Sequence, residues 1–172
     1  PSMRPGPGMT GRKIGVYGMG EIGRKIAARC AAFETEVAYY RRSKHDVPYA
    51  YHASLASLAE WADILMVAVR AGADTQHIVN ADILKKLGPQ GTIVNISRGS
   101  VIDQKALVAA LEGNVIAGAG LDVYEKEPHA PDALTKLPNV VLTPHIGGHT
   151  IESHVAMQDC VMANLDAFFA GK

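Results

Sequence analysis

The sequence Gly18-Met19-Gly20-Glu21-Ile22-Gly23 decides the fold, because it joins a short apolar run to a stretch with helical spacing. In a G-x-G-x-x-G turn of this kind, the first glycine allows a tight turn and the second lets a diphosphate approach the backbone. The third lets the helix pack closely on the strand, and free N–H groups at the helix start attract the diphosphate. We therefore predict a dinucleotide site at Gly18, Gly20, Glu21, Ile22 and Gly23. A glycine-rich turn without a ligand is the alternative.

On both sides of this turn, short apolar runs alternate with helical stretches. Most runs are continuously apolar, which is typical of strands buried on both faces of a parallel sheet. The predicted strands are residues 13–18, 35–40, 63–69, 91–97, 115–123 and 139–143. The predicted helices are residues 21–33, 54–61, 81–87, 103–112 and 150–170, with Asp103 as an N-cap and Gly113 as a C-terminal stop. Six strands with crossovers predict a single α/β domain, a doubly wound parallel sheet (Rossmann fold) with helices on both faces.

Composition excludes several classes of protein. The chain has 172 residues, of which 48% are hydrophobic and 20% charged, as in one globular domain. Lys plus Arg and Asp plus Glu each total 17, which is unlike a strongly basic nucleic-acid-binding protein. The apolar runs are shorter than the ~20 residues that span a bilayer, and no signal segment opens the chain, so we expect no membrane partner. Cys30 and Cys160 are too few for a disulfide framework, and we expect core positions for both in a cytoplasmic protein.

The balanced charge hides a basic start, because residues 1–44 hold nine Lys or Arg and three acidic residues. An NAD site usually has Asp or Glu about 20 residues after the glycines, where it binds the ribose 2′-hydroxyl. Here that region reads Tyr40-Arg41-Arg42-Ser43-Lys44, and no carboxylate appears before Asp46. Two guanidinium groups can pair with a 2′-phosphate. We therefore predict that Arg41, Arg42 and Ser43 favour NADP(H) over NAD(H); a solvated basic turn is the alternative.

Four polar residues follow the later predicted strands: Arg98, Asp122, Glu127 and His145. Ligands of open α/β sheets bind beyond the carboxyl ends of the strands, so we expect these side chains at the edge that carries the glycine turn. A cation and a His–carboxylate pair suit reduction of a carbonyl beside a carboxylate. Arg98 would bind the carboxylate, and His145 would give a proton to the carbonyl oxygen, its protonated form held by a carboxylate partner. Singly, each could instead be a surface or turn residue.

Together these motifs resemble the nucleotide-binding domain of the D-isomer-specific 2-hydroxyacid dehydrogenases. The similarity runs from about residue 10 to the C-terminus, and its further carriers are NISRGSV (95–101), GAGLDVYEKEP (118–128) and TPHIGG (143–148). The resemblance implies an NAD(P)-dependent oxidoreductase that reduces a 2-oxo acid to a D-2-hydroxy acid. In it, Arg98 binds and polarises the substrate, Glu127 partners the histidine, and His145 is the acid/base. The implied cofactor contacts are Val69, Thr75, Ile96, Ser97, Arg98, Asp122, His145, Gly147 and Gly148, with Asp122 at the nicotinamide end.

Within that family, the basic turn at Arg41 is similar to NADPH-using glyoxylate and hydroxypyruvate reductases. Two departures stand out: Val69-Arg70-Ala71 lacks the usual proline, and His149 replaces a small residue. A third is length, because family members typically carry a separate substrate domain before the glycine turn. We therefore expect a linker or cloning remnant at 1–12, a dinucleotide-binding domain at 13–149, and a helix at 150–172 that packs toward a missing substrate domain. Such a fragment or split gene product would dimerise, bind NADPH and reduce a 2-oxo acid very poorly.

Three other interpretations make different demands on the sequence. A catalytically silent dinucleotide-binding, sensing or interaction module would share the fold without turnover. Amino-acid dehydrogenases and other NAD(P)-binding proteins would lack the series Arg, Glu-Pro and His-Ile-Gly-Gly. A metal site at His145, His149 and His154 is disfavoured, because these residues straddle a glycine loop and a helix start rather than one helical face. We expect no metal.

Overall fold

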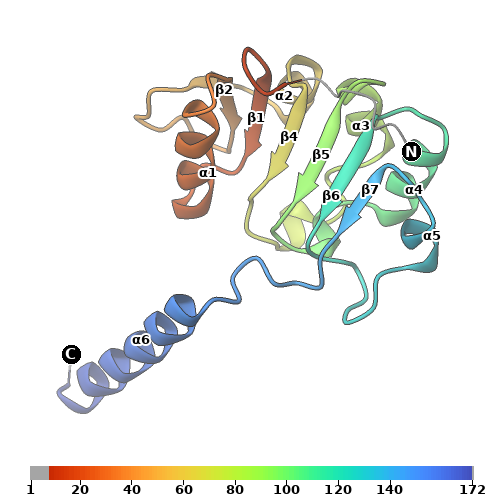
Figure 1. The fold of residues 1–172 in the computed structure, drawn as a ribbon. Coiled ribbons are helices and arrows are strands. Elements are labelled where there is room, and N and C mark those ends of the chain that lie inside the picture. The colour runs from red at the N-terminus through yellow and green to blue at the C-terminus, as the bar shows by residue number, and fades with distance from the viewer. Residues whose placement is uncertain (1–7, 172) are drawn as a thin grey trace.

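The computed structural model describes residues 8–171, so seven of the twelve residues of the expected N-terminal linker lie outside the described residues. Within residues 8–171 the chain forms one parallel sheet in the order β3-β2-β1-β4-β5-β6-β7 (Figure 1). The strands are β1 (Lys13–Tyr17), β2 (Glu36–Tyr40), β3 (Ala50–His52), β4 (Ile64–Val67), β5 (Thr92–Asn95), β6 (Gly118–Leu121) and β7 (Val140–Leu142). The strand order reverses between β1 and β4, which is where ligands bind in doubly wound sheets. The predicted fold class is confirmed.

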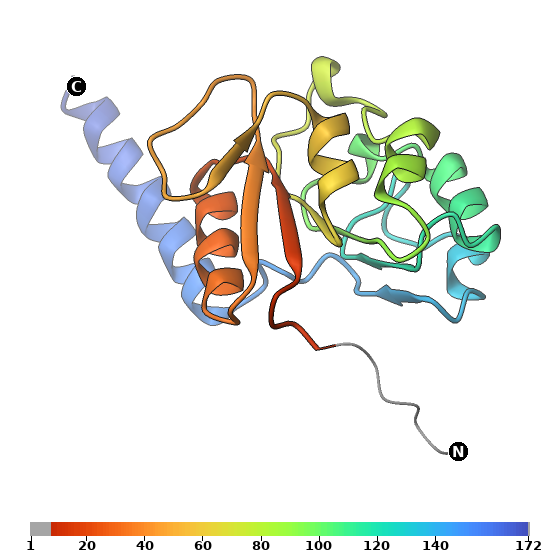
Figure 2. The ribbon, with the colours of Figure 1, turned by 90° about the horizontal axis from the view of Figure 1, so that it is seen from above.

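Helices cover both faces of the sheet, as Figure 2 shows from above. Helix α1 (Glu21–Ala31) packs on β1 and β2 over a small core that includes Ile14, Val16 and Tyr39. Helices α2 (Leu55–Trp61), α3 (Ala81–Leu87) and α4 (Gln104–Glu112) cover the opposite face over a larger apolar core. Three shorter helices lie in the connections between strands: η1 (Ala73–Thr75), η2 (Gly99–Val101) and α5 (Asp132–Thr135).

Side-chain caps explain where several helices begin. Asp103 accepts hydrogen bonds from the N–H groups of Lys105 and Ala106, and Gly113 follows the last turn of α4, as predicted. Ser54 and Asn80 cap α2 and α3 in the same way. The helices therefore begin where a short polar side chain can satisfy the free N–H groups of the first turn.

The expectation of six strands was wrong by one, because β3 was missed. This strand has three residues, follows the polar segment before Pro48, and pairs only with β2 at the edge of the sheet. So short a run carries no readable periodicity. The expectation of strands buried on both faces also fails beyond β2. In β4, buried Leu65 and Val67 alternate with half-exposed Ile64 and Met66; β5 and β6 alternate in the same way, and β7 has no buried residue. Beyond β4, no helix among residues 8–171 packs on the face that α1 covers at β1 and β2.

Helix α6 (Ile151–Phe169) extends away from the sheet (Figure 1), and none of its residues is buried. Thr150 caps it by accepting a hydrogen bond from the N–H of Ser153. Cys160 lies exposed on this helix and Cys30 is half-buried on α1, so the expected core position for Cys160 was wrong. Among residues 8–171, no helix is long and apolar enough to cross a membrane.

Candidate cofactor and active site

The glycine turn has the geometry that its motif requires. Gly18 has a φ of +101°, and a Cβ there would lie 2.6 Å from the carbonyl oxygen of Ala68 on the neighbouring strand end. A Cβ at Gly23 would lie 1.8 Å from the carbonyl oxygen of Gly18, so the helix approaches the strand end too closely for any side chain. A Cβ at Gly20 would meet nothing within 4 Å, and this open space lies at the uncapped start of α1. The turn therefore fits a diphosphate.

A cavity of about 1100 Å³ opens beside this turn and is large enough for a dinucleotide. Four loops at the carboxyl ends of strands β1, β2, β4 and β5 line it. It brings together most of the residues predicted to bind cofactor, namely Gly18, Gly20, Glu21, Ile22, Arg41, Arg42, Val69, Thr75, Ile96, Ser97 and Arg98. Gly23 packs beneath the turn instead, and Ser43, Asp122, His145, Gly147 and Gly148 do not line this cavity.

At the end of β2, the basic turn meets an acidic residue that sequence reasoning missed. Nη1 of Arg42 lies 3.1 Å from Oδ2 of Asp74, which belongs to η1 after β4. Behind the arginines, the rings of Tyr17 and Tyr40 stack with centroids 5.6 Å apart. Burial, with a smaller contribution from Tyr40, raises the pKa of Tyr17 to about 12, so its hydroxyl stays neutral. Arg70 is exposed and adds a cation to the cavity wall.

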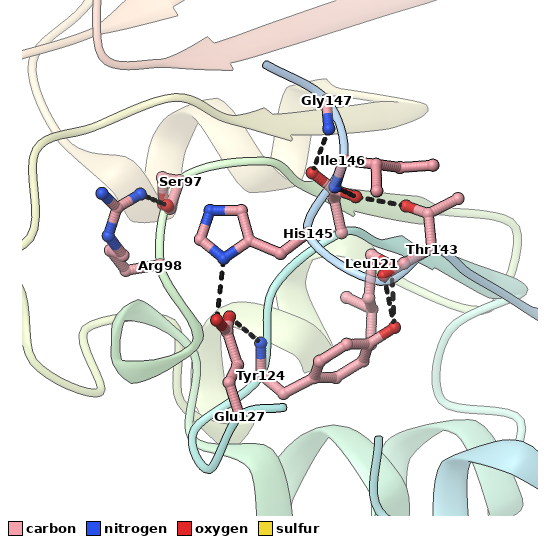
Figure 3. A network of polar contacts seen from close by, with 10 residues as sticks. Ser97, Arg98, Leu121, Tyr124, Glu127, Thr143, His145, Ile146 and Gly147 are labelled. Atoms are coloured by element: carbon pink, nitrogen blue, oxygen red, sulfur yellow. Dashed lines mark hydrogen bonds and ion pairs between the residues drawn. The ribbon is translucent and has the colours of Figure 1, made fainter. Parts of the chain in front are cut away.

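His145 and Glu127 form the pair that the sequence predicted. Nδ1 of His145 lies 2.7 Å from Oε2 of Glu127, while Oε1 of Glu127 accepts a hydrogen bond from the Tyr124 N–H (Figure 3). The hydrogen bond from His145 is the main cause that lowers the pKa of Glu127, so this carboxylate stays ionised. Nε2 of the ring points away from Glu127 (Figure 3) and is free of this contact.

Asp122 fixes the backbone that carries His145. Its Oδ1 accepts hydrogen bonds from the Thr143 hydroxyl (2.5 Å) and the Ile146 N–H (2.9 Å), and its Oδ2 from the Gly147 N–H (2.8 Å). His145 has a φ of +56°, a conformation that costs free energy for a residue with a Cβ. Burial raises the pKa of Asp122, but these hydrogen bonds outweigh it and lower the pKa overall.

Residues of the quoted motifs to which the sequence analysis gave no role hold the neighbouring loops at the same edge of the sheet. Oδ1 of buried Asn95 accepts hydrogen bonds from the N–H and hydroxyl of Ser97, and its amide donates to the Arg98 carbonyl. The Tyr124 hydroxyl donates to the Thr143 carbonyl, 2.8 Å away. A buried asparagine at the end of an apolar strand was the signal that could have identified Asn95.

Arg98 points its guanidinium back to its own segment, where Nη1 donates to the Ser97 carbonyl at 2.6 Å. The side chain is exposed, and the next residue, Gly99, is packed so closely on the Tyr124 backbone that a Cβ would lie 1.9 Å from it. The β5 and β6 ends are thereby locked together, with Arg98 on the cavity wall and Glu127 on the adjoining loop. The topology therefore brings Arg98, Glu127 and His145 to one edge of the sheet, as predicted.

In the described part of the chain, no group of three or more His, Cys, Asp or Glu side chains is arranged to hold a metal. Of the three histidines considered from the sequence, His149 and His154 contact each other, with 3.4 Å between Nδ1 and Nε2. His145 is paired with Glu127 instead.

Comparison with known proteins agrees with this geometry. The family model described as "D-isomer specific 2-hydroxyacid dehydrogenase, NAD binding domain" matches residues 1–147. The chain belongs to the D-isomer-specific 2-hydroxyacid dehydrogenase family. Within the family, hydroxyphenylpyruvate reductase of Plectranthus scutellarioides is 43% identical over 164 residues, which are 95% of this chain and 52% of the relative. Glyoxylate/hydroxypyruvate reductase A of Arabidopsis thaliana is 44% identical with the same coverage.

Solved structures of the family share the same architecture. The NADPH-dependent glyoxylate/hydroxypyruvate reductase of Sinorhizobium meliloti, determined with NADP and malonate, has a TM-score of 0.90 and 46% identity. The similarity covers 92% of this chain and 50% of that one. The chain thus corresponds to the NAD(P)-binding domain of its relatives and spans about half their length.

Proposed function

We propose that this chain is the cofactor-binding half of a reductase that converts a small 2-oxo acid, of the glyoxylate or hydroxypyruvate type, to its D-2-hydroxy acid. The observation that carries the proposal is the 2.7 Å pair between His145 and Glu127, at the strand-end edge that also carries the cavity and Arg98. A bound dinucleotide would supply the hydride for this reaction. The remaining steps, binding the acid and delivering a proton, fall to side chains of this chain.

Proton delivery follows from the pair. Glu127 stays ionised, so it accepts the Nδ1–H of His145 and fixes the orientation of the ring. Nε2–H is then free to donate to the carbonyl oxygen as negative charge develops there, and His145 ends the step neutral. Arg98 provides a guanidinium for the substrate carboxylate, which fixes the orientation of the 2-oxo group. The step consumes one hydride and one proton for each carbonyl reduced.

For the cofactor, we propose NADPH in preference to NADH. Arg41 and Arg42 line the cavity at the end of β2, and no carboxylate stands in the usual position for the ribose 2′-hydroxyl. The S. meliloti relative was solved with NADP. We further propose that a substrate domain completes the cleft, that the assembled protein is a homodimer, and that it works in the cytoplasm; these parts rest on family resemblance and composition.

The decisive experiment joins this chain to the half of the S. meliloti relative that the similarity does not cover, and follows NADPH oxidation with glyoxylate and hydroxypyruvate. His145→Gln should lower turnover by roughly 10²- to 10⁴-fold, because it removes the proton donor. NADPH binding, measured by fluorescence, should fall far less than turnover, because His145 does not line the cavity. His149→Gln is the matched control, since this exposed histidine contacts His154 rather than Glu127. Undiminished turnover in His145→Gln would contradict the proposal, and cofactor binding without any turnover would favour a silent binding module.

A further inference from the structure

The contact between Arg42 and Asp74 joins two loops on the wall of the cavity. Arg42 follows β2 and Asp74 belongs to η1 after β4, so the pair connects segments 32 residues apart in the sequence. Both residues line the cavity, and their side chains are 87% and 73% exposed. The pair therefore has no packing role, and both groups are open to a ligand in the cavity.

The backbone around Asp74 is well fixed. The Thr75 hydroxyl accepts a hydrogen bond from the Gly72 N–H at 2.9 Å, and it lies within hydrogen-bond distance of the Arg70 and Gly72 carbonyls. The Thr75 N–H donates to the Gly72 carbonyl, closing the turn. The turn thus fixes the backbone of Asp74 on the cavity wall, where its carboxylate meets Arg42.

The charge at this end of the cavity determines whether a ribose with a 2′-phosphate or one with a 2′-hydroxyl binds more tightly. A 2′-phosphate carries nearly two negative charges and needs the guanidinium groups of Arg41 and Arg42. Asp74 neutralises one of them and places a like charge within reach of the phosphate. A 2′-hydroxyl gains from the same carboxylate, because an acidic side chain is the usual acceptor for it in NAD sites.

We propose that Asp74 sets the discrimination between the two dinucleotides at this site: it weakens binding of the 2′-phosphate and offers an acceptor to the 2′-hydroxyl. The inference rests on the proposed cofactor site and deepens it. In this chain the acidic residue beside the basic turn lies in η1 after β4 rather than at the end of β2. Its site is therefore built for both cofactors, with the preference for NADPH moderated rather than absolute.

The test uses Asp74→Asn in this chain, with NADPH and NADH titrated by fluorescence. Exposed ion pairs have small energies, so we expect NADPH to bind roughly two- to fivefold more tightly. NADH should bind no more tightly than before, and the ratio of the two dissociation constants should rise. Asp159→Asn, on exposed α6, is the matched control and should leave the ratio unchanged. The gain should shrink at 1 M salt, where the screening length is only ~3 Å.

Adenosine 2′,5′-bisphosphate and adenosine 5′-monophosphate provide a second pair of probes that differ only in the 2′-phosphate. Asp74→Asn should strengthen binding of the first alone, and in an Arg42→Ala background most of that gain should disappear. Equal changes for both cofactors, or none, would overturn the inference and leave the proposed function intact. Failure of the unaltered chain to bind either dinucleotide would overturn both.

Discussion

At the scale of single residues, the Asp122 carboxylate determines whether His145 can be held in place. Thr143→Val removes the 2.5 Å hydrogen bond to Oδ1 and leaves the two backbone donors. We expect the Asp122 pKa to rise toward its ordinary value, measured by carbon NMR titration of the carboxyl group. Thr135→Val is the control, because that hydroxyl bonds only to the Asp132 carbonyl. An unchanged Asp122 pKa would show that the hydrogen bonds from the Ile146 and Gly147 N–H groups are enough to lower it.

The same substitution has a pH-dependent cost in stability. The pKa of folded Asp122 is lowered, so its contribution to stability is present above pH ~4, its unfolded value, and is lost as the pH falls through the folded pKa. Thr143→Val should therefore reduce the free energy of unfolding by about 1–2 kcal/mol at neutral pH. The difference should shrink at acid pH, as urea unfolding at several pH values would show.

Glu127 titrates under the influence of a single neighbour. The hydrogen bond from His145 is the main cause of its lowered pKa. The ion pair is therefore fully formed when the pH lies above the ordinary pKa of a glutamate, and it is lost as the pH falls through the lowered pKa. His145→Gln should raise the Glu127 pKa toward its ordinary value, again by NMR titration. A Glu127 pKa that stays low in this variant would assign the shift to the Tyr124 N–H instead.

Sequence reasoning succeeded for the residues at strand ends and failed for the residues that hold them. The topological rule was enough to bring Arg98, Glu127 and His145 together, because parallel strands end at one edge. The anchoring hydrogen bonds of Asp122 and Tyr124 join positions about 20 residues apart, and only the folded register creates them. The contact of Asp74 with Arg42 also exists only in the folded chain, so no local sequence pattern could predict it.

At the scale of elements, the β1–α1 unit separates the folding role of its glycines from their binding role. Gly23→Ala would place a Cβ 1.8 Å from the Gly18 carbonyl oxygen. We therefore expect the free energy of unfolding to fall by roughly 1–3 kcal/mol, and NADPH binding to weaken as well. Gly20→Ala meets open space, and it should keep the stability while weakening NADPH binding by obstructing the diphosphate. Urea unfolding and fluorescence titration measure the two effects. Equal stability losses in both variants would contradict this division.

The elements themselves were predictable where a strong signal marked their ends. Helix α4 begins after Asp103 and ends before Gly113 as expected, because both residues satisfy the free backbone groups of the helix. Strand β3 and helix α5 have three and four residues, too few to show a period. Their existence depends on edge pairing with β2 and on packing beside β7, which are tertiary effects.

At the scale of the whole molecule, two apolar surfaces of the described chain remain uncovered. One is the face of β5–β7 on the α1 side, where Val141 is 69% exposed. The other is α6, where large apolar side chains including Val155, Met162, Leu165 and Phe168 are exposed. Exposed apolar surfaces of this extent mark interaction sites. They agree with a chain that spans about half the length of its relatives and with the proposed substrate domain and dimer.

Helix α6 should be separable from the cofactor-binding domain. Because no residue of α6 is buried, a chain that ends at Thr150 should keep its urea midpoint and bind NADPH within about twofold of the full chain. A chain that ends at Asn139 is the contrasting variant, since it loses β7 with its pairing to β6 and the Tyr124–Thr143 hydrogen bond. We expect that variant to be strongly destabilised. If removal of α6 alone lowered the midpoint, the helix would have to pack on the domain in solution, and the independence of residues 13–149 would be refuted.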